Sequence, residues 1–179
     1  MKKTDMIRML RELDKRGLYV FARRDIEKMF PGESKNALEK SLQRLVENGL
    51  LLRAARGVYV NPEAASRDGW AIERIAKALR PGCHSYVSLE SMLSEWGVIS
   101  QIPVGRITIM TTGAGGTFNT PYGTIEFTHT KRGLADIMAH TVTVPNRPMR
   151  IATKRAAIRD LMRVGRNINM MDPDELSDE

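Results

Sequence analysis

Three side chains that can hydrogen-bond to the edges of DNA bases, Lys35, Asn36 and Lys40, stand close together in the sequence. An asparagine amide can form two hydrogen bonds with adenine, and a lysine ammonium can donate to guanine or to a phosphate. If this segment is helical, the three residues occupy its first two turns. Because recognition helices enter the major groove by their N-terminal part, we predict that these residues contact DNA. The alternative is an ordinary solvated helix face.

Further cations near this segment are predicted to hold DNA without reading its sequence. Arg53 and Arg56 flank a predicted hairpin turn, where they suit phosphates or a narrow minor groove. Arg23 and Arg24 are predicted to add contacts with the DNA backbone, and Arg44 a further contact with DNA. The other polar residues of the helix are interpreted as a solvated face: Glu39, Gln43 and Glu47.

The elements that must position these side chains lie in residues 1–62. Apolar residues recur at helical spacing in three segments, which we predict to be helices at residues 4–16, 23–30 and 34–48. Ser34 is the predicted N-cap of the third helix. Two strands are expected at residues 50–53 and 57–60. This order of elements is typical of a winged helix-turn-helix, a domain that also serves as a protein-binding module.

Residues 66–171 are predicted to form a mixed α/β C-terminal domain, so the expected fold class is α+β. The expected helices cover residues 68–79, 88–97 and 153–166, and the expected strands 106–112, 122–130, 141–144 and 149–152. Ser88 is the expected cap of the second helix, and the residues from Gly113 to Gly116 are expected to form a hairpin turn. The last segment, 172–179, is an acidic tail that we expect to be disordered.

A row of basic residues follows the last predicted helix. Arg155, Arg159, Arg163 and Arg166 recur at spacings of four, four and three residues, which places them on one face. Lys154 precedes them. Three interpretations stay open: a solvated face, a second nucleic-acid surface, and a surface for an acidic partner.

The residues that most often carry enzyme chemistry or bind metals do not form a familiar pattern here. The glycines of 113–116 lack the Lys-Ser/Thr ending of a phosphate-binding loop. Cys83, His84, His129 and His140 lack the spacing of a metal site. No serine lies in a nucleophile elbow, and no pair of carboxylates is set for acid–base work. We therefore expect no enzyme, no metal and no cofactor.

The charge of the chain predicts that it binds polyanions, and its hydropathy predicts a cytoplasmic protein. The net charge is +7, and residues 1–60 and 61–171 each hold 14 Lys and Arg and 8 Asp and Glu. Such a basic surface favours polyanions without choosing among them. We expect no membrane segment, because no apolar run approaches the length needed to span a bilayer. No signal-peptide pattern is present either, so we expect a cytoplasmic location.

Several short stretches, taken in their order, resemble the AbiEi-type antitoxins of type IV abortive-infection systems. These stretches are Arg56-Gly57-Val58-Tyr59, Tyr86-Val87-Ser88-Leu89-Glu90-Ser91, Trp96-Gly97, Ile107-Thr108-Ile109, Thr111-Thr112, the segment from Thr120 to Phe127, and Ile151-Ala152-Thr153-Lys154-Arg155-Ala156. The resemblance covers nearly the whole chain. It implies a protein that represses its own operon by binding inverted repeats in the promoter. It also implies that the protein counteracts a nucleotidyltransferase-like toxin without requiring a stable complex.

The function that we predict from the sequence is therefore an antitoxin that autoregulates its transcription. Its partners would be double-stranded promoter DNA and the toxin. A second hypothesis is a transcriptional regulator whose C-terminal domain senses a ligand or oligomerises, with no antitoxin role. A third is an adaptor whose winged helix contacts protein in place of DNA.

Overall fold

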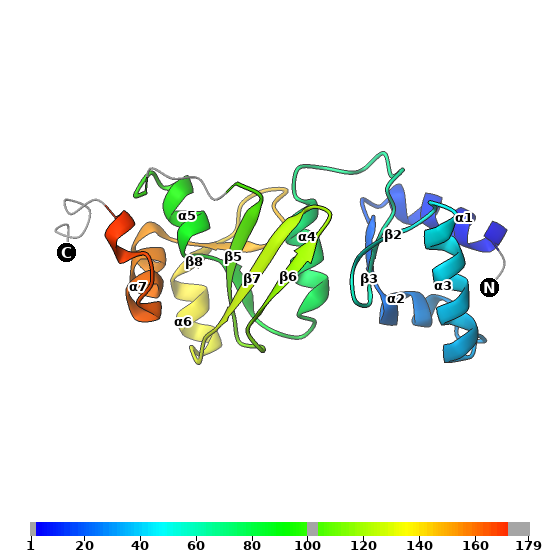
Figure 1. Cartoon of the computed structure of the whole chain (residues 1–179). Coiled ribbons are helices and arrows are strands. Elements are labelled where there is room, and N and C mark those ends of the chain that lie inside the picture. Colours follow the sequence, from blue (N-terminus) through cyan, green and yellow to red (C-terminus); the bar gives the residue numbers. More distant parts are fainter. Residues whose placement is uncertain (1–2, 100–103, 172–179) are drawn as a thin grey trace. The chain divides into compact units, whose positions relative to one another are not determined.

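The computed structural model describes residues 3–99 and 104–171, so the acidic tail 172–179 lies outside the described residues. The described part of the chain holds seven α-helices and two β-sheets, and the fold is therefore mixed α/β. Figure 1 follows the chain through these elements from the N-terminus to the C-terminus. Packing divides the chain into two compact units, Met1–Leu79 and Arg80–Glu179. No helix within the described residues is long and apolar enough to cross a membrane.

The first unit combines four helices with a small antiparallel sheet. In chain order its elements are α1 (Lys3–Asp14), β1 (Val20–Ala22), α2 (Arg23–Met29), α3 (Lys35–Glu47), β2 (Leu52–Ala55), β3 (Val58–Val60) and α4 (Ala71–Leu79). The strand order is β1-β3-β2, so β3 is the central strand. The helices and strands predicted from the sequence are present here, with ends that differ by a few residues.

The core of this unit consists of the apolar residues that recur at the predicted helical spacing. Leu38, Leu42 and Leu45 of α3 are buried against α1 and α2, where Met6 and Ile26 are also buried. The N-cap of α3 is confirmed, because the Oγ atom of Ser34 accepts a hydrogen bond from the backbone N–H of Ala37 at 3.2 Å. The leucines on one side and the cap at the start fix which residues of α3 face outward.

The domain boundary lies later than the sequence predicted. We placed residues 68–79 at the start of the second domain, but α4 packs on β1 and β3 of the first unit. The hydroxyl of Tyr19 donates to Asp68 at 2.6 Å, and Arg74 of α4 pairs with the same carboxylate at 2.6 Å. These bonds lower the pKa of Asp68 to about 2, and burial raises the pKa of Tyr19 to about 12. Contacts between distant residues therefore hold α4 in place.

The second unit is a six-stranded mixed sheet with three helices and a short 3₁₀ turn. Its elements are β4 (Ser85–Val87), α5 (Glu90–Glu95), β5 (Arg106–Thr111), β6 (Gly116–Thr120), β7 (Gly123–His129), α6 (Leu134–Ala139), β8 (Thr141–Val142), β9 (Arg150–Ala152), α7 (Lys154–Val164) and the 3₁₀ turn Ile168–Met170. The strand order is β6-β7-β5-β4-β9-β8. Two pairs, β5 with β7 and β4 with β9, are parallel.

Two local predictions for this unit are wrong. The loop around Gly113 is not a hairpin turn, because β5 and β6 lie on opposite sides of β7 and the chain crosses between them. Ser88 does not cap α5, because the N-cap is Leu89, with φ of 57°. The Ser88 hydroxyl instead donates to Asp160 at 2.9 Å.

The helices α5 and α7 pack against each other and against the sheet, α5 on β5 and α7 on β9. Thr108 of β5 bonds to the segment that begins α5, and Tyr86 of β4 donates to Asp160 of α7 at 2.9 Å. The helix α6 lies beside α7, to which the pair Asp136–Arg159 joins it at 3.5 Å. Polar side chains therefore contribute to the contact between the helices and the sheet.

Candidate nucleic-acid interface

The three predicted base-contacting residues lie exposed on the first two turns of α3. Lys35 and Asn36 belong to the first turn, and Lys40 follows one turn after Asn36. Within residues 3–99 and 104–171, their side chains make no hydrogen bond or ion pair that would compete with a ligand. Arg44, one turn further, is exposed as well. The structure thus brings these residues together on one helix.

The hairpin of β2 and β3 presents the next two predicted residues. Arg53 is exposed on β2, where the pairing with β3 shifts register by one residue before Ala55. Arg56 occupies the turn beside Gly57, whose φ of +75° is a conformation that glycine adopts without strain. One cation therefore lies on β2 and the other in the turn of this short two-stranded ribbon.

A groove of about 520 Å³ lies between α3 and the hairpin. Its hairpin side carries Arg53 and Arg56, and Tyr59 of β3 also lines it. Its α3 side carries residues that the sequence analysis interpreted as solvated: Glu39, Gln43 and Glu47. The groove is therefore basic on one wall and acidic or polar on the other.

Arg23 joins the two walls at the start of α2. Its backbone N–H donates to the carbonyl of Gly57 at 2.8 Å, which ties α2 to the hairpin turn. Its guanidinium donates to Glu27 at 3.0 Å and lies 3.6 Å from a carboxylate oxygen of Glu39. Arg24, by contrast, is exposed beside Asp25 at 3.7 Å. The charge of Arg23 is thus already shared with two acids, which sequence reasoning missed.

The basic row predicted on the last helix is only partly formed. Lys154, Arg155 and Arg163 are exposed on α7, but Arg159 pairs with Asp136. Arg166 does not belong to the row, because α7 ends at Val164 and Gly165 turns the chain with φ of +73°.

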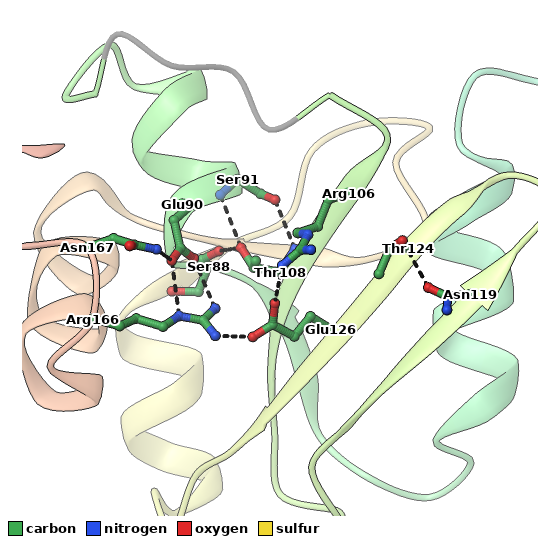
Figure 2. A network of polar contacts seen from close by, with 10 residues as sticks. All are labelled: Ser88, Glu90, Ser91, Arg106, Thr108, Asn119, Thr124, Glu126, Arg166 and Asn167. Carbon is green, nitrogen blue, oxygen red and sulfur yellow. Dashed lines mark hydrogen bonds and ion pairs between the residues drawn. The ribbon is translucent and has the colours of Figure 1, made fainter.

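Arg166 instead lies among acidic residues, as Figure 2 shows. Its Nε and Nη2 atoms donate to the two oxygens of Glu90 at 3.0 and 3.1 Å, and its Nη1 atom donates to Glu126. Asn167 adds a bond to Glu90 at 2.8 Å, and Arg106 one to Glu126 at 3.1 Å. Burial raises the pKa of Glu90, but the bonds from Asn167 and Arg166 outweigh it and hold that pKa below its usual value. The network fastens the segment after α7 to the sheet.

A second network surrounds Asp160, which is fully buried in α7. It accepts hydrogen bonds from Tyr86 and Ser88 at 2.9 Å each, and Arg132 donates to it at 3.0 Å. Burial, together with the charge of Asp160, raises the pKa of Tyr86. Asp160 therefore does not offset the exposed cations of α7, because its charge is balanced by Arg132 inside the unit.

Among the described residues, no hydrogen bond joins the cysteine and the histidines named in the sequence analysis to one another. His129 Nδ1 lies 2.8 Å from the carbonyl oxygen of Gly113, and His140 Nδ1 lies 2.8 Å from that of Asp136. In the parts of the chain that the structure describes, no group of three or more His, Cys, Asp or Glu side chains is placed to hold a metal ion.

Comparison with known proteins gives no relative for this chain. No protein-family model matches it, and no curated protein and no solved structure does so either.

Proposed function

We propose that the first unit is a winged helix-turn-helix that binds duplex DNA, with α3 as the recognition helix and the β2–β3 hairpin as the wing. The observation that carries this proposal is the groove between α3 and the hairpin, because Arg53 and Arg56 line its hairpin wall and α3 forms the other. The exposed Lys35, Asn36 and Lys40 lie on the same helix, outside the lining of the groove. The order α1, β1, α2, α3, β2, β3 supports the same assignment.

The dimensions and charges of these elements suit duplex DNA. The major groove of B-DNA, about 12 Å wide, accommodates one α-helix. With α3 in the major groove, the adjacent DNA strand would enter the groove of the protein, and Arg53 and Arg56 would contact its phosphates. Each phosphate neutralised by a cation contributes to affinity by releasing counterions. The recognition residues and the wing therefore have separate tasks, reading bases and holding the backbone.

For the wider role we propose an autoregulating antitoxin that acts in the cytoplasm. The support is the resemblance of the sequence to AbiEi-type antitoxins, and the DNA would then be the promoter of the protein's own operon. Co-expression with the neighbouring gene tests this role. Growth restored by this protein would support an antitoxin, whereas unaltered growth of cells with the neighbouring gene alone would favour a regulator without that role.

A binding assay with matched variants tests the DNA-binding proposal. Lys35→Ala/Asn36→Ala/Lys40→Ala should lose at least about tenfold in affinity for the promoter duplex, because base and phosphate contacts disappear together. The control Arg11→Ala/Arg16→Ala removes the same charge from exposed positions on or just after α1 and should bind like the unmodified protein. Equal loss in both variants, or in neither, would contradict the assignment of α3.

A further inference from the structure

Two polar side chains on the groove side of α3 contact charged neighbours in the structure. Glu39 lies 3.6 Å from the Arg23 guanidinium, which Glu27 holds from the other side at 3.0 Å. Gln43, one turn later, donates an amide hydrogen to Glu47 at 3.0 Å. Residues that read a ligand gain from such contacts, because less side-chain freedom is lost on binding.

A carboxylate at this place is unexpected in a surface that binds phosphates. Glu39 is repelled by the DNA backbone, so it weakens binding to every sequence alike unless it gains a specific partner. In the major groove that partner is the N4 amino group of cytosine, because guanine and thymine present acceptors that repel a carboxylate. Adenine offers an amino group, but its neighbouring N7 atom is an acceptor too.

We infer that Glu39 is a base-reading residue that makes the protein require cytosine at one position of its DNA site, and that Arg23 is the residue that positions it. This inference rests on the proposed function and names a specificity determinant within the same site. Arg23 has a double task here. It orients the Glu39 carboxylate and, by its charge, lowers the repulsion between that carboxylate and the phosphates that enter the groove.

The inference changes the interpretation of α3. Directly opposite the buried leucines lie Asn36, Lys40, Gln43 and Glu47, spaced i, i+4, i+7 and i+11, and Glu39 lies beside them toward the hairpin. The cations Lys40 and Arg44 are exposed outside the lining of the groove, whereas the Glu39 carboxylate, a hydrogen-bond acceptor, lines the groove beside the wing. Such a division lets the protein reject a wrong base pair by repulsion as well as select the right one by attraction.

The test selects binding sites from a pool of random duplexes and then measures affinity for the best site with each base pair replaced in turn. The unmodified protein should show one position where cytosine is preferred by about tenfold or more. Glu39→Ala should bind all four base pairs there within about threefold, and Glu39→Gln should shift toward adenine, which suits an amide. The control Glu63→Gln makes the same charge change at an exposed residue outside the groove and should keep the cytosine preference.

The positioning role of Arg23 has its own readout. Arg23→Ala should reduce the cytosine preference when Glu39 is present and leave preference unaltered in the Glu39→Ala background, because the two residues act through one contact. A Glu39→Ala protein that keeps the preference, with affinity raised equally for all sites, would overturn the inference while leaving DNA binding intact. Failure of the unmodified protein to bind any duplex would overturn the proposed function itself.

Discussion

Residues 1–79 hold 17 basic and 11 acidic residues and residues 80–171 hold 11 and 5, so the two ranges carry the same net charge of +6, yet the two units use these charges differently. In the first unit Lys35 and Lys40 stay exposed on α3, and Arg53 and Arg56 stay exposed on the hairpin wall of the groove. In the second unit many cations face inward, where Arg132 and Arg166 neutralise buried acids. Charge counts therefore cannot show where a polyanion binds, because a paired arginine stabilises the fold and contributes little to the outer field.

The largest effect expected from this comparison is a loss of stability in the second unit. Arg166→Met should lower its free energy of unfolding by about 3 kcal/mol, because the carboxylate of Glu90 would remain buried without its countercharge. Arg163→Met, an exposed cation on α7, should change the same quantity by less than about 0.5 kcal/mol. Denaturant unfolding measures both. Equal losses in the free energy of unfolding would show that the inward-facing Arg166 and the exposed Arg163 contribute alike to stability.

The next effect concerns DNA affinity and should leave stability unaltered. Arg53→Ala/Arg56→Ala should lose about two units from the slope of log affinity against log salt concentration, one for each phosphate contact. The free energy of unfolding should stay within about 0.5 kcal/mol, because both side chains are exposed. An unaltered salt slope, measured by fluorescence anisotropy, would remove the hairpin from the interface.

A matched variant in α7 tests whether the exposed cations of the second unit also contact DNA. Arg155→Ala/Arg163→Ala removes the same number of charges from the second unit, and the salt slope should stay within about half a unit of the unmodified value. A fall of about two units would instead show that α7 is a second surface for DNA.

The smallest effect is a pH dependence in the first unit. The pKa of Asp68 is about 2 in the folded protein, against 3.8 as the ordinary value. A lowered pKa stabilises the fold above the ordinary value, and that contribution is lost as the pH falls from about 4 to about 2. Asp68→Asn should lack this part of the acid transition and be slightly less stable at pH 7, as thermal unfolding at several pH values would reveal. An identical pH profile for both proteins would contradict the role of Asp68.

Local signals explain why much of the first unit could be predicted. The leucine spacing of α3, the cap at Ser34 and the positive φ of Gly17, Gly49 and Gly57 act within a few residues of each element. The exposed positions of Lys35 and Asn36 follow from that spacing alone. The helices and strands of the first unit, and the exposed face of the candidate site, could therefore be predicted from the sequence.

What could not be predicted depends on residues that are far apart in the chain. Arg166 meets Glu90 and Glu126 across 76 and 40 residues, so its helical spacing gave a misleading face. Tyr19 reaches Asp68 across 49 residues, which moved the domain boundary. The ion pair of Arg23 with Glu39 depends in the same way on how α2 packs beside α3.

The central claim is that DNA meets the first unit at α3 and the hairpin. Backbone amide chemical shifts, recorded while promoter duplex is added to the full chain, test it most directly. We expect the largest changes at the first two turns of α3 and at the turn of β2 and β3, with little change in α7. Chemical-shift changes confined to the second unit, with unaltered shifts in α3 and the hairpin, would contradict the account.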